Sequence, residues 1–185
     1  MPIICKPFVF VRHGETALNR DKLIGGSTDV PLTEEGELQA QEVRPLLGRY
    51  RWNGIAVSPL LRARQTAELA LPDVPYTVFD DLRERDWGEL ERRPWSEQPP
   101  YEETPPGGES WEAFCHRVTG ALNTILTQYE RPLIIAHSGV FRVLRRHALG
   151  TPYGIRLGNV VPMWISPGQQ PNEWRIVPLE EADER

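Results

Sequence analysis

Apolar residues form two short runs that each end on a histidine. The first run, Phe8–Val11, is followed by Arg12 and His13, and the second, Leu133–Ala136, is followed by His137. Short apolar runs rich in β-branched and aromatic residues are typical of strands that are buried on both faces, as in a parallel sheet. Because open α/β sheets bind ligands outside the carboxyl ends of their strands, we expect the two histidines to share one site.

Apolar residues at three- and four-residue spacing predict four helices elsewhere in the chain. Thr33 is the expected N-cap of the first helix and Ser58 that of the second, which has Pro59 at its first helical position. The helices are expected at 34–47, 60–71, 109–129 and 140–149, and the apolar stripe of the first is formed by Leu38, Ala40, Val43, Leu46 and Leu47.

Shorter β-branched or aromatic segments predict further strands at 54–57, 75–79, 160–165 and 174–177. Strands that alternate with helices favour an α/β fold, a three-layer α/β/α sandwich with a mostly parallel central sheet. A chain of 185 residues is long enough for one domain with a sizeable core. We therefore expect a single domain over residues 1–179 and a charged, solvated tail at 180–185.

The segment 92–108 differs from the rest of the chain because it contains five prolines, at positions 94, 99, 100, 105 and 106. Proline is disfavoured in the interior of helices and of central strands, so this segment is expected to be a loop. A loop of this length inside a compact domain is usually functional, and we interpret it as a lid. Trp95, within the loop, is either a packing residue or a platform for substrate.

The net charge of −5 disfavours a nucleic acid or an anionic membrane as a partner, because both require a basic surface. An anion site must then be a local concentration of arginine. Cys5 and Cys115 have no metal-binding or redox spacing, and we interpret them as free thiols in a reducing compartment rather than as a disulfide. The N-terminal apolar run is too short to span a membrane and lacks the cleavage site of a signal peptide, so we expect a cytoplasmic protein.

Arg12, His13, Arg62 and His137 would form a compact cationic pocket if the ends of neighbouring strands meet. The guanidinium fork matches phosphate oxygens, and neutral imidazole is a competent nucleophile toward phosphorus near physiological pH. The pocket therefore suits a phosphoryl group. By charge alone, three other arginines could take the place of Arg62, namely Arg64, Arg83 and Arg85.

Phosphoryl transfer also needs an acid that protonates the leaving oxygen, and a carboxyl group with a raised pKa can supply that proton. Three carboxyl groups are candidates from the sequence: Glu84, Glu15 and Asp86. We expect neither a metal nor a cofactor, because the chain contains no His-x-x-x-His or His-Glu pair. His116 and His147 are assigned no role.

Short motifs follow one another along the chain in a fixed order. They are Val11–Thr16 with Asn19, Asp29–Gly36 with Gln39 and Ala40, Ser58–Leu60 with Arg62 and Thr66, Leu82–Glu84 with Gly88 and Glu91, Pro105–Ser110 with Arg117, and Ala136–Gly139 with Arg142. Together they closely resemble the histidine phosphatase superfamily, the phosphoglycerate-mutase-like group, from about residue 8 to residue 159. A lone Arg-His-Gly would be weak evidence, whereas the ordered series is specific.

The resemblance implies a phosphoglycerate-mutase-like sandwich and phosphoryl transfer through a phosphohistidine, without a metal. It implies that His13 is the nucleophile, and that Glu84 is the general acid and then the base that activates water. The other residues that it implies are Arg12, Arg62 and His137, which bind the phosphoryl group, and Asn19, Thr16 and Ser138, which assist in binding substrate.

Two departures from the family pattern stand near these motifs. The family often has Gly-Gly after its second histidine, where this chain has Ser138-Gly139, and we expect little effect because serine is tolerated at a helix start. The family commonly has glycine after the position of Glu91, where this chain has Arg92 followed by Arg93. The two arginines are either a solvated surface pair or part of the substrate mouth, where they would favour a second anionic group.

We therefore predict a phosphomonoesterase that hydrolyses a small phosphorylated metabolite through a phosphohistidine on His13. Phosphoglycerate mutase is one alternative, although the family's mutases tend to be longer, and a non-catalytic phosphate-binding module is another. Among phosphatases, the motif Pro105–Ser110 and the chain length are most similar to α-ribazole phosphatases, and sugar phosphates and phosphoglycerate stay open as substrates. The partner is the small metabolite, and a homodimer is a further candidate.

Overall fold

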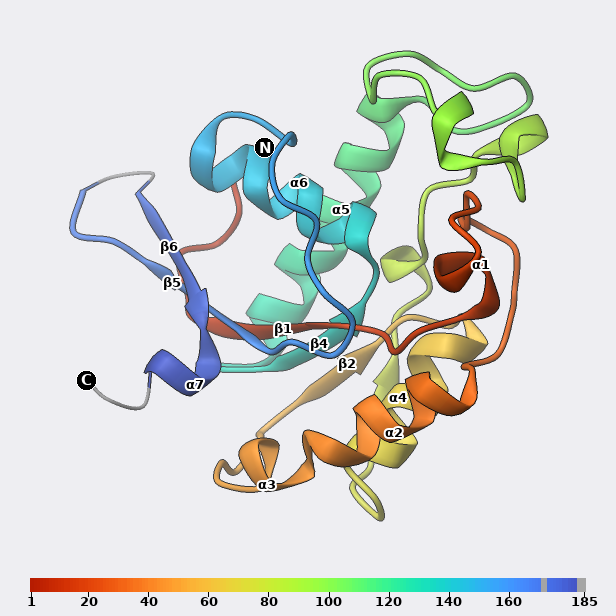
Figure 1. The fold of residues 1–185 in the computed structure, drawn as a ribbon. Coiled ribbons are helices and arrows are strands. Elements are labelled where there is room, and N and C mark those ends of the chain that lie inside the picture. The colour runs from red at the N-terminus through yellow and green to blue at the C-terminus, as the bar shows by residue number, and fades with distance from the viewer. Residues whose placement is uncertain (171–172, 183–185) are drawn as a thin grey trace.

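The computed structural model describes residues 1–170 and 173–182, and within them six strands form one mixed sheet in the order β3-β2-β4-β1-β5-β6 (Figure 1). The pairings among β1 to β4 are all parallel, and β5 and β6 add an antiparallel edge. The predicted α/β class with a mostly parallel sheet is confirmed. The strands are β1 (Phe8–Arg12), β2 (Ile55–Val57), β3 (Thr77–Val78), β4 (Leu133–Ala136), β5 (Met163–Pro167) and β6 (Trp174–Pro178).

Helices cover both faces of this sheet. On one face lie α5 (Trp111–Gln128) and α6 (Ser138–Leu149), and on the other lie α2 (Glu34–Glu42), α3 (Arg44–Leu47) and α4 (Leu61–Ala70) (Figure 1). Alternate side chains of β1 enter the two cores: Phe8 and Phe10 pack with α5 and α6, whereas Val9 and Val11 pack with the helices opposite. Because both faces are buried, the strand is apolar at every position rather than at every second one.

The pairing of β1 with β4 brings the two histidines to one edge of the sheet. Arg12 is in register with Ala136, and the His13 amide donates a 3.0 Å hydrogen bond to the Ala136 carbonyl oxygen. Both strands end here, so the residues that follow each of them leave the sheet side by side. This is the juxtaposition that the sequence pattern predicts for the shared site.

The predicted helix at 109–129 is confirmed, whereas the predicted helix at 34–47 differs from the structure in its continuity and in its buried side. The stripe of α5 is buried along its length, and Ser110 caps the helix by accepting from the Ala113 amide. In the first predicted helix, Val43 separates α2 from α3, which has Pro45 in its first turn, and Leu38 is 50% exposed rather than buried. The reason is that α2 faces the core through the small residues Gly36 and Ala40, and Leu38 lies on the opposite side of the helix from Gly36.

The remaining elements are short. Residues 180–182 of the predicted tail belong to α7, whose first residue, Leu179, is buried, whereas residues 183–185 lie outside the described part. The predicted strand at 75–79 shortens to the exposed edge strand β3. The short helices are α1 (Ala17–Arg20), α7 (Leu179–Ala182) and three 3-10 turns, η1 (Asp80–Leu82), η2 (Gly88–Leu90) and η3 (Trp95–Glu97).

Candidate active site

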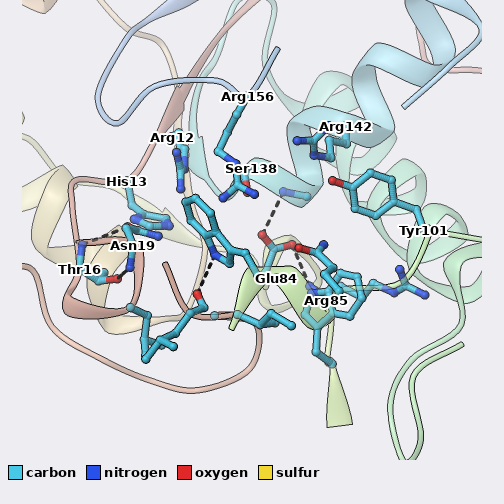
Figure 2. Close-up of a pocket in the computed structure, with 18 of the residues that line it drawn as sticks. Arg12, His13, Thr16, Asn19, Glu84, Arg85, Tyr101, Ser138, Arg142 and Arg156 are labelled. Atoms are coloured by element: carbon cyan, nitrogen blue, oxygen red, sulfur yellow. Dashed lines mark hydrogen bonds between the residues drawn. The ribbon is translucent and has the colours of Figure 1, made fainter. Parts of the chain in front are cut away.

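A cavity lies beyond the carboxyl ends of β1 and β4, and Figure 2 shows the side chains around it. Most of the residues predicted for the site line this cavity: Arg12, His13, Thr16, Asn19, Arg62, Glu84 and Ser138. His137 lies behind the wall, fully buried, with its ring centroid 5.2 Å from that of His13. The structure therefore brings together residues from separate segments of the chain.

His13 is held as a neutral imidazole with one nitrogen free. Its Nδ1 lies 2.7 Å from the Gly14 carbonyl oxygen, and because a carbonyl can only accept, Nδ1 carries the proton and Nε2 does not. Burial, followed by the positive charges of Arg62 and Arg12, lowers the pKa of His13 well below its ordinary value of 6.5. The free lone pair on Nε2 is what a nucleophile requires.

The two arginines beside His13 are fixed by backbone carbonyl groups. Arg12 donates from Nη1 to Leu157 over 2.7 Å, and Arg62 donates from its two terminal nitrogens to Thr28 and Gly26 over 2.8 and 2.7 Å. Burial, and next the charge of Arg156, lowers the pKa of Arg12 to about 10, so the side chain stays charged at neutral pH. Carbonyl partners orient a guanidinium without neutralising it, and the positive charge therefore remains available to an anion.

Glu84 is the one member of the three acid candidates that lines the cavity. Its two carboxyl oxygens accept from the Arg85 and Gly139 amides, each over 2.9 Å. Burial raises the pKa of Glu84 above its ordinary value of 4.5, although both hydrogen bonds and the neighbouring arginines oppose the shift. The other two carboxyl groups are engaged elsewhere: Glu15 accepts from Thr33, and Asp86 accepts from Gly88 and Ser27.

The glycine after Ser138 is required by its closeness to Glu84. A Cβ atom on Gly139 would overlap Oε1 of Glu84, so no larger residue fits beside the carboxyl group. Ser138 is the first residue of α6, and the N-cap position belongs to His137, so the serine does not serve as the cap. Of the two positions at which the family often has glycine, this chain therefore departs at residue 138, where a side chain is tolerated.

Ser58 has a different role from the predicted helix cap. The N-cap of α4 is Leu60, and the Ser58 hydroxyl lies 2.6 Å from Nε2 of His137. Residue 58 follows β2, which is the neighbour of β4 in the sheet, and the hydroxyl can therefore reach across to the histidine. The contact fixes the ring orientation of His137, whose Nδ1 has no partner among the described residues.

Arg117 of α5 anchors the segment that carries Glu84. Its guanidinium pairs with Glu109 over 2.7 Å and donates to the Asp81, Arg83 and Glu84 carbonyl oxygens. The pair is largely buried, with side chains that are 10% and 17% exposed. These bonds tie η1 and Glu84 to the longest helix, which keeps the carboxyl group in a fixed position.

Thr16 and Asn19 cap the short helix α1 reciprocally. The Thr16 hydroxyl accepts from the Asn19 amide, and the Asn19 carboxamide oxygen accepts from the Thr16 amide over 3.0 Å. Both side chains also line the cavity. The capping box thus holds two predicted substrate-binding residues in place next to His13.

The proline-rich segment covers the cavity, and three of its side chains line it: Trp95, Gln98 and Tyr101. The segment is attached to the loop before it, since the Trp95 indole donates to Leu23 over 2.9 Å and the Ile24 amide donates to Arg93. Trp95 is therefore a wall of the cavity, which favours the platform interpretation. Trp111, at the start of α5, lines the cavity as well.

Three further arginines line the cavity that the sequence did not place there: Arg85, Arg142 and Arg156. From charge alone, Arg85 could take the place of Arg62, and the structure shows that both line the cavity. The other two arginines considered for this role, Arg64 and Arg83, do not line it. Arg142 belongs to the motif that follows His137 in the sequence, although the sequence assigned it no role. Arg156 lies between α6 and β5 in a segment with no motif, so no signal in the sequence marked it.

Arg92 and Arg93 belong to the surface rather than to the cavity wall. Both are exposed, and Arg93 pairs with Glu97 over 2.7 Å. Glu91, just before them, accepts from the Gly26 and Thr28 amides and so holds the loop that binds Arg62. The interpretation of a solvated pair is the one that the structure supports.

Arg92 has a φ angle of 68°, in the left-handed region where glycine is favoured. Replacing Arg92 with glycine is expected to raise the free energy of unfolding by about 0.5–1 kcal/mol, because it relieves this strain. Arg93→Gly is the matched control and is expected to lower stability, since position 93 does not have a positive φ. Urea denaturation of the three proteins measures both changes, and a destabilised Arg92→Gly protein would contradict the interpretation.

Beyond the ends of β1 and β4, the α/β sandwich brings together a histidine, two fixed arginines and a buried carboxyl group. The chain matches the family model of the histidine phosphatase superfamily (branch 1) over residues 8–159. It belongs to that superfamily.

Individual relatives agree with this assignment. The chain is 32% identical over 173 residues to the "Uncharacterized phosphatase PhoE" of Bacillus subtilis (strain 168), with 90% of each chain covered. Its fold is similar to the α-ribazole phosphatase of Shigella flexneri, with a TM-score of 0.79, 27% identity, and 93% and 95% of the two chains covered. The phosphoglycerate mutase of Thermus thermophilus follows with a TM-score of 0.71, 32% identity, and 91% and 96% covered.

The chain is accordingly an enzyme of the phosphatase and phosphoglycerate mutase group, as the sequence motifs predict. In the part of the chain that the structure describes, no helix is both long and apolar enough to cross a membrane. No cluster of three or more potential metal-ligating side chains occurs among residues 1–170 and 173–182. Cys5 is exposed and Cys115 is buried, and both are free thiols.

Proposed function

We propose that this enzyme hydrolyses phosphate monoesters of a small metabolite through a phosphohistidine on His13. The observation that carries the proposal is the state of His13: a buried neutral imidazole whose Nδ1 donates to Gly14, which leaves Nε2 with a free lone pair beside Arg12 and Arg62. A positively charged site that keeps its histidine unprotonated suits attack on phosphorus.

The reaction proceeds in two displacements. In the first, Nε2 of His13 attacks phosphorus, the bond to the ester oxygen breaks, and that oxygen takes the proton of Glu84. In the second, the Glu84 carboxylate takes a proton from water, which attacks phosphorus, and the N–P bond breaks to return neutral His13. The raised pKa of Glu84 suits both steps, because the group must hold a proton and then accept one.

The other predicted residues would bind the transferring group. Arg12 and Arg62 present their guanidinium groups to its equatorial oxygens, and His137, whose ring centroid lies 5.2 Å from that of His13, would bind the same group. Ser138 lies at the N-terminus of α6, where unpaired amides and the helix dipole favour an anion. Thr16 and Asn19 complete the wall on the side of α1.

Hydrolysis is favoured over mutase activity by the size of the lid. The lid is the segment 92–108, which contributes Trp95, Gln98 and Tyr101 to the cavity wall. A mutase must exclude water until it returns the phosphoryl group, which asks for a more complete cover. The substrates that we propose are α-ribazole phosphate, because of the relative from Shigella flexneri, or a sugar phosphate or phosphoglycerate.

Two assays run side by side test this proposal. Release of nitrophenol from para-nitrophenyl phosphate is measured next to conversion of 3-phosphoglycerate to 2-phosphoglycerate, with the same enzyme preparation. We expect hydrolysis to exceed isomerisation. Faster isomerisation would assign the enzyme as a mutase, and binding of phosphate esters without either turnover would assign it as a phosphate-binding module.

The pH profile of kcat/KM follows from the two pKa shifts. His13 must be unprotonated, and because its pKa is lowered well below 6.5, activity is expected to fall on the acid side only well below that pH. Glu84 must be protonated in the first displacement, so activity is expected to fall as pH rises through its raised pKa, above 4.5. The profile is a bell whose acid limb lies well below pH 6.5 and whose basic limb lies above pH 4.5. An acid limb centred at pH 6.5 or higher would contradict the assignment of His13.

A further inference from the structure

The cavity contains more positive charge than one phosphoryl group requires. Among the described residues, five arginines line it, whereas Glu84, with its raised pKa, is the one carboxyl group in the wall. No carboxylate forms an ion pair with any of these five guanidinium groups within residues 1–170 and 173–182. The chain as a whole carries a net charge of −5, so this concentration of uncompensated arginine is local to the cavity.

Arg12 and Arg62 flank the nucleophile, and Arg85 is held by the protein through two of its three guanidinium nitrogens, whereas its buried Nη1 has no partner among the described residues. Its Nε and Nη2 donate to the Glu109 and Glu103 carbonyl oxygens, and its guanidinium packs on the Trp87 ring at 4.5 Å. A phosphoryl dianion at His13 would offset about two positive charges. Three cations of the wall, Arg85, Arg142 and Arg156, then have no anion to balance them, and of these Arg142 and Arg156 are not held by two carbonyl groups as Arg85 is.

These two arginines continue the row of positive charge away from His13. In Figure 2, Arg156 lies between Arg12 and Arg142, and the Tyr101 hydroxyl points toward Arg142. The charges also act on one another, since Arg156 contributes to the lowered pKa of Arg12, and Arg142 contributes to the lowered pKa of Arg156, after burial in each case. An anion placed at Arg142 and Arg156 would relieve this repulsion.

Each of the two guanidinium groups is held by its face against an aromatic ring of the lid. Arg156 lies 3.9 Å from the Trp95 ring, and Arg142 lies 4.9 Å from the Tyr101 ring. Arg142 uses one nitrogen to donate to Pro152 over 3.0 Å, and for the Arg156 guanidinium no hydrogen bond is seen among the described residues. Stacking fixes the plane of a guanidinium while it leaves the N–H groups at the edge free to bind a planar or tetrahedral oxyanion.

We propose that Arg142 and Arg156 form a second anion subsite, and that the leaving group of the substrate carries its own negative charge, a carboxylate or a phosphate. This inference rests on the proposed phosphatase function and narrows its substrates: of those named above, phosphoglycerate has a charged leaving group, whereas α-ribazole phosphate and simple sugar phosphates have neutral ones. The phosphoryl group binds at Arg12 and Arg62, and the second anion binds across the cavity, beneath Trp95 and Tyr101 of the lid. The substrate mouth therefore does contain a cationic pair, although Arg92 and Arg93 do not form it.

Matched aryl phosphates test the subsite. The kcat/KM values of 3- and 4-carboxyphenyl phosphate are compared with those of 3- and 4-carbamoylphenyl phosphate, which have nearly the same shape without the charge. We expect one carboxylate isomer to exceed its carboxamide by about 10- to 100-fold, the range of a charge-assisted hydrogen-bonded pair. The corresponding phenylene bisphosphates, compared with the carboxylates, show which oxyanion the subsite prefers.

Substitutions assign the preference to the two arginines. Arg156→Gln and Arg142→Gln are each expected to reduce the ratio of carboxylate to carboxamide toward 1, whereas Arg93→Gln, an exposed arginine of the same lid, is expected to keep it. Because both substrates are measured on one preparation, a partial loss of folded protein cancels in the ratio. A ratio that is unchanged in both cavity variants would overturn the assignment.

The outcome separates failure of the subsite from failure of the proposed function. Turnover of all the esters at equal kcat/KM by the unmodified enzyme would overturn the subsite and leave the phosphatase function intact. If none of the esters is turned over, calorimetric binding of the same pairs to the His13→Ala protein decides: tighter binding of the carboxylate supports the subsite, and equal binding overturns it.

Discussion

Replacing His13 with alanine is expected to lower the rate of phosphate ester hydrolysis by about 10⁴-fold or more, because it removes the atom that forms the bond to phosphorus. The arginines that bind the phosphoryl group stay in place, since they are held by backbone carbonyl groups rather than by His13. Binding of substrate is therefore expected to persist. The measurement is steady-state turnover together with detection of the phosphorylated enzyme after a quench in alkaline detergent, because the N–P bond is acid-labile.

His116→Ala is the matched control for this change. His116 is an exposed histidine of α5 that does not line the cavity, and its removal is expected to leave turnover unchanged. The phosphorylated enzyme is expected in the control and not in the His13→Ala protein. Phosphorylation that survives the loss of His13 would place the intermediate on another residue.

Replacing Glu84 with glutamine is expected to slow hydrolysis by about 10²- to 10⁴-fold, because glutamine has nearly the same shape and no transferable proton. Alkyl phosphates need a proton on the leaving oxygen, whereas nitrophenolate leaves readily without one. With para-nitrophenyl phosphate the variant is therefore expected to release a burst of nitrophenol and accumulate the phosphohistidine, since water is no longer activated. With an alkyl phosphate no burst is expected.

The control for Glu84 takes account of its hydrogen bonds. The carboxyl group accepts from two amides, and the amide nitrogen of glutamine cannot accept from either of them, so a moderate loss of stability accompanies the change. Thermal unfolding is measured beside the kinetics, and Glu89→Gln, exposed and in the same segment, is expected to behave like the unmodified enzyme. Equal losses of substrate binding and of rate for both ester classes would make Glu84 a structural residue.

Sequence reasoning predicted the strands and helices whose side chains have the same surroundings along the whole element. The run at β1 is apolar at every position because helices cover both faces of the sheet, and the stripe of α5 is regular because one face of a long helix packs on one core. Leu38 shows the limit of this reasoning. Spacing alone placed it in the core, and the close approach of α2 through Gly36 turned it toward solvent.

Within the site, the meeting of Arg12, His13 and His137 could be predicted from the order of residues along the chain, because their motifs stand at strand ends that must meet at one edge of the sheet. Three features needed the folded molecule: the raised pKa of Glu84, the contact of Ser58 with His137, and the reach of Arg156 into the wall from a segment without a motif. They could not be predicted because burial, hydrogen-bond partners and electrostatic environment depend on residues far apart in the chain. Arg156 does not differ from other arginines of the chain until the fold surrounds it.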